Sequence, residues 1–402
     1  MKVNKYRNAA LSAFFIACPL VSYADGWPSW QPETAAVPFV FSTESMGLTV
    51  GGAGVIKGVG QPQAAVLGAG VVSDKGSWIG YLGASNFQLG RRFLFGLEGY
   101  DSEFVGFEYY LGDAAKNDGV QSEAIIASSR ESLYRFSARY VLPLGAGTYQ
   151  GAKAAYWPTR TITGSNPVDS GVTSIEVQPF YQSRNLEENQ PAGEATKSVG
   201  AKLTLDWDNR DHPRNPTSGS QSQFTLTRGL AEQEQDAWWT WEAEQSAFFD
   251  LGNLGNVFDK QVIAVNVYTG DTPSWEDDPY YQPPAFAGLK LGGLYRLRSF
   301  QSGRFHDRSA LSYTAEYRVM PDWQPLGELP VFNLYDVPWW QWVAFMDVGR
   351  VASEYNLREL HQNMKWSAGV AMRFQVEGVV VRSEMAWGSE DSLFRVMINQ
   401  PF

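Results

Sequence analysis

The sequence has few of the residues that carry most enzyme chemistry. Its single cysteine, Cys18, lies near the N-terminus, and the whole chain has 3 histidines. No G-x-S-x-G, H-E-x-x-H or paired metal-ligand spacing occurs in it. The only pairing of a nucleophile with a base, Ser309 with His306, supports no more than a distant barrel-lipase hypothesis. We therefore expect a protein that is not an enzyme and that has no metal site and no cofactor.

The chain is also short of basic residues and of long apolar runs. Its 32 Lys and Arg against 43 Asp and Glu give a formal net charge of −11, so we expect no nucleic acid partner. It has no apolar run of about 18 residues, the length that a membrane-spanning helix needs. A membrane β-barrel remains compatible with that absence, because its strands are apolar only at every second residue.

The first 24 residues are typical of a secretory signal peptide. A basic start at residues 2–7 precedes a short apolar run at residues 9–17, and a small-x-small cleavage site ends at Ala24. Cleavage there would remove Cys18 and leave 402 − 24 = 378 residues without disulfide or thiol chemistry. A lipoprotein signal at Cys18 is the alternative, although the residues beside that cysteine suit it poorly.

Almost all of the remaining chain alternates apolar and polar residues. In MKWSAGVAMRFQV (residues 364–376), the large apolar side chains fall on one face of an extended strand and the polar ones on the other. Such segments run for about 10 to 13 residues, which suits a tilted membrane strand better than a globular one. Aromatic residues such as Trp238 and Trp387 lie near segment ends, as in interfacial girdles. We predict an all-β fold, a transmembrane antiparallel β-barrel.

The alternation predicts about sixteen strands, an even number as in single-chain bacterial barrels. The clearest are expected at residues 131–142, 147–158, 172–184, 196–208, 218–229, 238–251, 259–270, 308–320, 341–351, 365–376, 378–388 and 392–402. The others, rich in glycine, are expected between residues 47 and 112. Residues 25–43 are too few and too rich in proline to fold alone. We therefore expect them to be a short N-terminal segment, and residues 44–402 to form the barrel domain.

The C-terminus has the pattern of an outer-membrane strand. Phe402 is the last residue, and Phe394, Val396 and Ile398 precede it at alternate positions. A terminal aromatic strand of this kind resembles the assembly signal of bacterial outer-membrane barrels. The resemblance implies that the barrel-assembly machinery handles the chain during biogenesis. It also implies that the barrel lies in the outer membrane, among lipids and lipopolysaccharide.

The most distinctive stretch is LTLDWDNRDHPRNPTSGSQSQFTL (residues 203–226). It resembles the D-x-R-D…P-T-x-G strand-turn-strand of the bacterial surface antigen superfamily, which contains the barrel-assembly insertase and the two-partner-secretion transporters. The matching residues are Asp208, Arg210, Asp211, Pro216 and Gly219. We expect a charged periplasmic turn whose side chains bind exposed backbone groups, and a metal or substrate site is the alternative.

The stretch GGLYRLRSFQSGRF (residues 292–305) matches a second feature of that superfamily. An Arg-Gly-aromatic tip occurs there on a long loop that folds back into the barrel, and here the tip reads Arg298-Ser299-Phe300, with serine in place of glycine. Two further segments, YTAEYR (residues 313–318) and FMDVGR (residues 345–350), resemble strands of the same family.

The resemblance implies that Arg298 and Phe300 enter the barrel with this loop. Glu316 and Asp347 should face the interior, because a carboxylate on the lipid face is costly. A charge-assisted pair between Arg298 and one of these carboxylates would hold the loop inside. The alternative is a loop exposed to solvent, with carboxylates that pair locally.

The stretch GDTPSWEDDPYYQPP (residues 270–284) is rich in carboxylates. Calcium ligation by Asp271, Glu276, Asp277 and Asp278 is one interpretation. We expect instead a solvated surface loop next to lipopolysaccharide and its divalent counter-ions.

The resemblance does not extend to the polypeptide-transport-associated domains that precede the barrel in this superfamily. We therefore expect a short, barrel-only member that assists transport or insertion of a polypeptide or lipid at the outer membrane, with a separate periplasmic adaptor. A passive structural or pore-type surface protein without a client is the rival hypothesis. The two differ at the seam between the first strand, expected near residues 47–58, and the last. A transport barrel of this family is expected to open there.

Overall fold

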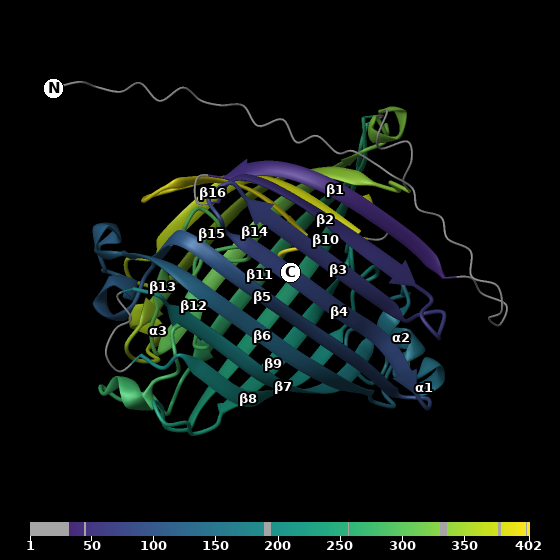
Figure 1. Cartoon of the computed structure of the whole chain (residues 1–402). Coiled ribbons are helices and arrows are strands. Elements are labelled where there is room, and N and C mark those ends of the chain that lie inside the picture. The colour runs from purple at the N-terminus through teal and green to yellow at the C-terminus, as the bar shows by residue number, and fades with distance from the viewer. Residues whose placement is uncertain are drawn as a thin grey trace.

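The computed structural model describes residues 32–43, 46–188, 194–255, 257–329, 336–376, 379–398 and 400–402. In this part of the chain, sixteen strands form one antiparallel sheet in which each strand pairs with the next one along the chain. The sheet curls into a barrel (Figure 1). The predicted signal peptide, residues 1–24, lies outside the described residues.

The strands of the barrel are β1 Glu33–Thr43, β2 Gly47–Lys57, β3 Ala65–Ser73, β4 Trp78–Leu89, β5 Phe93–Tyr109, β6 Ile125–Val141, β7 Val172–Leu186, β8 Lys197–Asp208, β9 Gly219–Gly229, β10 Trp238–Leu254, β11 Phe258–Asp271, β14 Ser309–Pro321, β15 Trp340–Ala352, β16 Lys365–Val376, β17 Val379–Gly388 and β18 Ser392–Ile398. A small ribbon pairs β12 Lys290–Leu291 with β13 Phe305–His306. The helices are η1 Gly112–Ala115, η2 Gln121–Glu123, α1 Gly147–Gln150, α2 Lys153–Tyr156, η3 Pro279–Tyr281, η4 Leu326–Glu328 and α3 Leu357–Leu360. No helix in the described residues is long and apolar enough to cross a membrane.

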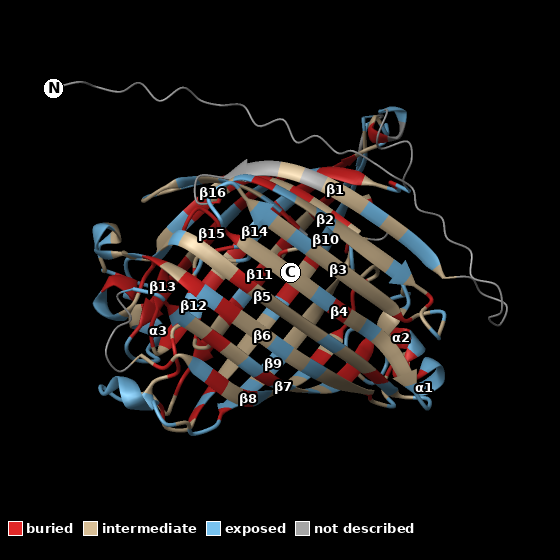
Figure 2. Cartoon of the chain, in the orientation of Figure 1, coloured by how far each residue is buried: buried red, intermediate tan, exposed pale blue. Residues whose placement is uncertain are grey.

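The barrel is polar inside and largely apolar outside. On β14, Thr314, Glu316 and Arg318 are buried, whereas Tyr317 on the opposite face is 37% exposed. Figure 2 shows buried and exposed positions alternating along many of the strands. A soluble barrel would have the reverse distribution, so this pattern is that of a barrel whose outer surface contacts lipid. The predicted fold class is confirmed.

One predicted strand is wrong. Residues 147–158 form α1 and α2 instead of a strand. Gly145, before α1, and Gly151, between the helices, have φ of 49° and 60°, and a Cβ at Gly151 would lie 2.3 Å from the main-chain oxygen of Arg91. The residues between are mostly small and do not alternate, so they pack as helical turns at one end of the barrel, with Ala154 buried.

Residues 33–43, which we expected to lie outside the barrel, form β1. This strand pairs with β2 along its whole length. Pro38 interrupts the sequence pattern, but proline is tolerated in a strand at the end of the sheet order because it lacks only a backbone donor. The barrel therefore begins at Glu33 and not at residue 44, and the first strand of the seam is β1 instead of the expected strand near residues 47–58. The predicted number of strands is right, although one expected strand is replaced by another.

The connection between β11 and β14, residues 272–308, folds into the barrel, and we call it the inward loop. Its Leu291, Leu297, Phe300 and Phe305 are buried in one apolar cluster with Tyr268 and other side chains of the wall. The inward loop therefore has its own apolar core inside a largely polar lumen.

Candidate functional site

The tip of the inward loop is a tight turn with unusual backbone angles. Gly292 and Gly293 precede it with φ of 92° and 125°, and a Cβ at Gly292 would lie 2.6 Å from the main-chain oxygen of Gln301. Leu297 also has a positive φ, 49°, and its oxygen accepts a 3.0 Å hydrogen bond from the amide of Phe300. The paired glycines are therefore required by the path of the loop.

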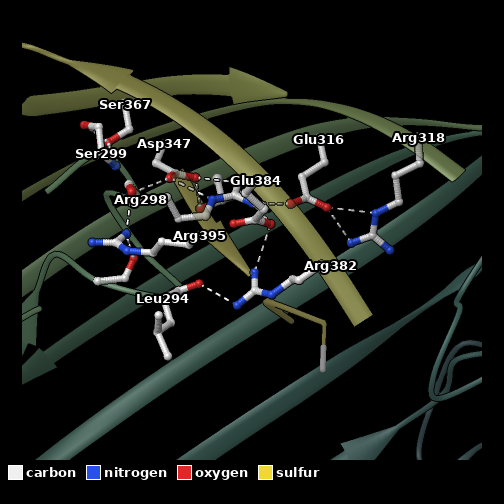
Figure 3. Close-up of polar contacts among 12 residues, drawn as sticks. Leu294, Arg298, Ser299, Glu316, Arg318, Asp347, Ser367, Arg382, Glu384 and Arg395 are labelled. Carbon is white, nitrogen blue, oxygen red and sulfur yellow. Dashed lines mark hydrogen bonds and ion pairs between the residues drawn. The ribbon is translucent and has the colours of Figure 1, made fainter. Parts of the chain in front are cut away.

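Arg298 is the centre of the site (Figure 3). Its Nε and Nη2 donate to the two oxygens of Asp347 at 3.0 and 2.9 Å, and its amide donates to the same carboxylate at 3.0 Å. Its Nη1 donates to Glu316 at 2.7 Å, and the guanidinium lies 3.5 Å from the ring centroid of Phe345. The motif resemblance offered Glu316 or Asp347 as the partner. In the structure Arg298 binds both and is only 1% exposed.

This pair belongs to a larger buried network. Its members are Arg298, Arg318, Arg373, Arg382, Glu316, Asp347 and Glu384. Glu316 also accepts from two nitrogens of Arg373 at 2.9 and 2.7 Å and from Arg318 at 2.9 Å. Glu384 accepts from Arg382 at 3.0 Å. Because all these charges are desolvated, the loss of one partner would leave another buried and unpaired.

Arg395 joins the inward loop to the last strand, β18. It donates to three main-chain oxygens of the loop at distances from 2.6 to 2.9 Å. The acceptors are the oxygens of Gly293, Arg298 and Phe300. Arg382 on β17 donates in the same way to Leu294 at 2.7 Å. The loop is thus bound to β14 and β15 through Arg298, and to β17 and β18 through main-chain oxygens of the loop.

Ser299, which stands where the family pattern has glycine, is accommodated without a positive φ. Its amide donates to the hydroxyl of Ser367 at 3.0 Å, and the two serine hydroxyls lie 2.7 Å apart. Room for Ser299 comes from Gly388, where a Cβ would lie 2.0 Å from the serine hydroxyl oxygen. The absence of a side chain at Gly388 on the barrel wall therefore leaves the space that a serine at the tip needs.

Arg304 is a second anchor of the inward loop and is as buried as Arg298. It donates to both carboxylate oxygens of Glu390 at 2.6 and 3.0 Å. It also donates to the main-chain oxygens of Ala114 and Gly119 at 2.8 and 2.7 Å. Arg304 therefore connects the inward loop to two other connections at the same end of the barrel.

Arg296, the third arginine of the stretch, lies in a more open place. It pairs with Glu244 at 2.7 Å, lies 3.7 Å from the ring centroid of Tyr268, and its side chain is 22% exposed. Both residues border a lumenal pocket of about 310 Å³. The rest of its lining is almost wholly polar or charged and includes Arg139, Lys202, Asp206 and Glu242.

The sequence predicted roles for Arg298, Glu316 and Asp347, which the structure brings together, and for Phe300, which packs in the apolar cluster of the inward loop. Sequence reasoning missed the residues that complete the network and the second anchor, which are Arg304, Arg373, Arg382, Glu384 and Arg395. A signal for them existed in the alternation. Arg395, for example, stands between Phe394 and Val396, which are 40% and 36% exposed on the outer face, so its position already predicted an inward side chain.

The carboxylates of Asp208 and Asp211, at the turn of residues 209–218, bind nearby groups of the protein. Asp211 accepts from the amides of Thr217 and Ser218 at 2.9 and 3.2 Å. Asp208 accepts from two nitrogens of Arg210 at 2.8 and 3.1 Å, and Arg160 lies 2.6 Å from it. These contacts support the structural interpretation of the motif rather than the metal or substrate site.

The turn also depends on two other features of the motif. Pro216 is buried, and Gly219 has φ of 96°. A Cβ at Gly219 would lie 2.0 Å from the main-chain oxygen of Asn209, so no other residue fits without displacement of the backbone. His212 accepts from the amides of Arg214 and Asn215 through Nδ1 at 3.2 and 3.1 Å. Burial lowers the pKa of His212, which keeps Nδ1 available as an acceptor.

The C-terminus corrects the expectation that residues 392–402 form one strand. β18 ends at Ile398, and Phe402 lies inside the barrel. Its ring centroid is 6.0 Å from that of Phe248, which is buried on the inner face, and the Arg318 guanidinium lies 5.3 Å from it. The terminal aromatic is therefore not the outward-facing end of the last strand.

The residues before Phe402 explain this turn into the lumen. Gln400 accepts from Arg373 at 2.8 Å and donates to the main-chain oxygen of Arg214 at 3.2 Å. Pro401 cannot donate a ladder hydrogen bond, so it does not extend β18. The role of Phe402 as an assembly signal stays a prediction.

In residues 270–284, Asp271 is buried, whereas Glu276, Asp277 and Asp278 are exposed as expected of a surface loop. Asp271 accepts from Arg308 at 3.1 Å and from Ser309 at 2.7 Å, and Asp278 accepts from the amide of Tyr280 at 2.9 Å. In the described residues, no group of three or more His, Cys, Asp or Glu side chains could hold a metal ion.

Ser309 and His306, the nucleophile and base considered for a lipase, have different partners. Ser309 donates to Asp271, whereas Nδ1 of His306 lies 2.6 Å from the main-chain oxygen of Leu289. Burial lowers the pKa of His306 to about 4. The imidazole is therefore neutral near pH 7 and donates from Nδ1 to the Leu289 oxygen.

The model of the Omp85 superfamily domain matches residues 88–387. The chain belongs to the Omp85 superfamily. This membership places it in the bacterial outer membrane and supports a role of the transporter or insertase type. Among curated proteins, none matches this chain.

Solved structures share the fold of this Omp85 protein at low sequence identity. BamA from Haemophilus ducreyi lacking POTRA domains 1–3 matches with a TM-score of 0.51 and 11% identity, over 91% of this chain and 70% of that one. CdiB from Escherichia coli matches with 0.55 and 12%, over 98% and 67%. CdiB from Acinetobacter baumannii matches with 0.54 and 11%, over 97% and 65%. These likenesses concern the fold alone.

Proposed function

We propose that this Omp85 protein assists the transport or insertion of a polypeptide or lipid at the outer membrane by opening at the seam between β1 and β18. The observation that carries the proposal is the attachment of β18 to the inward loop through Arg395. Because three hydrogen bonds join the strand to the loop, a movement of the loop is transmitted to the seam.

On one side of the seam the edge strand, β18, is short. β18 has 7 residues and β1 has 11, so at least 11 − 7 = 4 residues of β1 have no counterpart in β18. The two strands contact each other, and within the described residues no paired register joins them. The chain turns inward after Ile398, which shortens the edge. An edge of this kind accepts a strand from another chain.

A disulfide across the seam tests the proposal. The predicted mature chain has no cysteine, so a cysteine on β1 and another on β18 would form the only bridge. The matched control is a bridge between Ala53 and Ala69, which are register partners in β2 and β3. Crosslinking in living cells first identifies bound clients and any separate periplasmic adaptor. We expect the oxidised seam variant to lose client delivery and to regain it on reduction, while the control variant keeps it.

A passive, plugged barrel is the second candidate. It is favoured by the filled interior, where the apolar cluster of the inward loop and the C-terminal Phe402 both occupy the lumen. Under this hypothesis the oxidised seam variant behaves in cells as the reduced variant does, and no client is captured. That pair of results would exclude lateral opening.

A further inference from the structure

A groove on the outer wall, away from the inward loop and the seam, has no part in the proposed function. It is an open groove of about 540 Å³ over β5 to β9. Its lining is mainly apolar and includes Leu97, Tyr134, Phe136, Tyr181 and Leu230, each at least 39% exposed. The volume lies within the range of about 300–1,000 Å³ that is usual for ligand pockets.

The groove forms where the hydrogen-bond ladder of the wall is interrupted. β6 and β7 pair at Arg135 opposite Phe180 and again at Ala138 opposite Val177, whereas the positions between are unpaired, although both strands are fully described. Pro179 stands in this gap and has no N–H to donate. The register is the same on both sides, so the interruption is local. The outer wall therefore has a depression where the ladder between β6 and β7 is interrupted.

Arg228 borders the groove and has no partner among the described residues. It lies on the outer face of β9, between its register neighbours Ala201 on β8 and Trp239 on β10. Its neighbours on that face are apolar, and a cation facing lipid costs stability unless it lies near the interface or meets an anion. The Arg228 guanidinium is therefore available for an anionic ligand.

The charges at the other parts of the groove fix where an anionic group would bind. Asp101, beyond the opposite edge, accepts hydrogen bonds from Tyr134 at 2.5 Å and Ser132 at 2.6 Å. Arg135, which also lines the groove, is neutralised by Glu98 at 2.8 Å. An anion is thus repelled from the β5–β6 side and attracted to Arg228.

The position of Arg228 along the barrel indicates which leaflet of the outer membrane surrounds it. It lies one residue before the end of β9, at the same barrel end as the inward loop, which is the longest connection in the described chain. Long connections of outer-membrane barrels face the cell exterior. The lipid beside this end is therefore that of the outer leaflet, a phosphorylated glycolipid with several acyl chains.

We propose that the groove binds this phosphorylated glycolipid, with a phosphate on Arg228 and acyl chains across the apolar lining. Guanidinium and phosphate form charge-assisted, bidentate hydrogen bonds, for which an unpaired arginine is suited. A wide groove with several exposed aromatic and aliphatic side chains suits a lipid with more than one chain. The site does not involve the seam, so the test of lipid binding does not depend on the outcome of the test of transport.

Native mass spectrometry of the full chain in detergent, with diphosphorylated lipid A added, tests this assignment. Arg228→Gln is expected to weaken binding about tenfold or more, because it removes a charged contact to phosphate. Ala201→Trp should also weaken binding, because it fills the groove without a change in charge. The matched control is Arg130→Gln, which removes an exposed arginine that pairs with Glu103 and should bind lipid A as the wild type does.

Two arms separate this lipid from others. Dephosphorylated lipid A and phosphatidylglycerol are expected to bind at least tenfold more weakly than lipid A, and Arg228→Lys to keep part of the affinity. The assignment is overturned if Arg228→Gln and Ala201→Trp both bind as the wild type does, or if the two other lipids bind equally well. Heat-dependent gel mobility shows whether each variant is folded. If Arg228→Gln does not fold, Ala201→Trp and the dephosphorylated lipid decide the matter.

Discussion

The main-chain oxygen of Arg298 accepts a 2.6 Å hydrogen bond from the guanidinium of Arg395. Arg298 is the tip of the inward loop and binds β14 and β15 through its side chain, whereas Arg395 belongs to the last strand. The two arginines therefore couple the position of the inward loop to the position of β18 at the seam. A displacement of β18 breaks main-chain contacts of the loop, and a displacement of the loop releases β18.

Arg298→Ala should destabilise the barrel more than substitution of the other two loop arginines. It leaves the buried Asp347 and Glu316 short of a partner, which costs about 3–5 kcal/mol. Arg304→Ala should follow, because Arg304 is equally buried but its partner Glu390 is 16% exposed. Arg296→Ala should have the smallest effect, because the Arg296–Glu244 pair is partly exposed and water weakens such an ion pair. Heat-dependent gel mobility gives the three unfolding midpoints, and equal, negligible shifts would refute the anchoring role of Arg298.

Arg395→Gln should loosen the inward loop without loss of the Arg298 pair. The substitution removes the forked donor that reaches three main-chain oxygens, while the contacts of Arg298 with Asp347 stay in place. We expect faster proteolysis of the loop and a nearly wild-type unfolding midpoint. Arg395→Lys is the matched control, because lysine keeps the charge but not the planar fork, and it should give an intermediate rate. Unchanged proteolysis in both variants would argue against the coupling of loop and seam.

Gly219→Ala should be much more harmful than Gly60→Ala. Both glycines have positive φ, 96° and 68°, so both substitutions carry the cost of a left-handed backbone, about 1–2 kcal/mol. Only at Gly219 does the new Cβ also meet a main-chain oxygen, whereas at Gly60 nothing lies within 4 Å. The difference between the two variants in unfolding midpoint measures that steric term. Equal midpoints would show that the turn adjusts freely.

The turn at residues 209–218 should lose stability in acid through His212. Its folded pKa lies below the usual value of 6.5 because of burial, so the neutral form is the one that the fold favours. The stabilising contribution is therefore complete above pH 6.5 and is lost as the pH falls through the folded pKa. An NMR titration of the imidazole should give a pKa below 6.5, with the amide signals of Arg214 and Asn215 following the same curve. A pKa at or above 6.5 would contradict the prediction.

Deletion of Phe402 should slow assembly of the barrel. The deletion removes the ring that packs on Phe248 and under Arg318, in addition to the terminal aromatic that the assembly machinery is expected to recognise. Pulse-chase labelling with heat-dependent gel mobility follows the rate at which folded barrel forms. Phe394→Ala, on the outer face of β18, is the control. Assembly at the wild-type rate after deletion would leave Phe402 with a packing role alone.

Much of the fold could be predicted from the sequence because the information is local. Alternation along a strand assigns each side chain to one face of the sheet, whatever its neighbours are. This predicted the barrel, most of its strands, the inward positions of Glu316 and Asp347, and the polar lumen. The turn at residues 209–218 was equally predictable, since its carboxylates and Gly219 act within a few residues of one another.

The tertiary structure alone decided what depends on pairing between distant segments. Residues 33–43 are a strand only because β2 offers a register for them, and residues 147–158 are helical because Gly151 packs against the main chain of the distant Arg91. The alternation places Phe402 outside, yet the terminal residues turn inward, since Gln400 finds partners in the lumen and Pro401 cannot extend the ladder.

The pairing of charges in the site also depends on distant segments and could not be predicted from the sequence. Alternation marks Arg373, Arg382 and Arg395 as inward residues, but an inward arginine is locally the same whichever carboxylate it meets. Which arginine binds Glu316, and which binds the loop, is set by strand register and by the depth to which the loop enters the barrel. The sequence by itself determined that charges would line the lumen. Only the curled sheet, by bringing β14 to β18 around one loop, decided which of them pair.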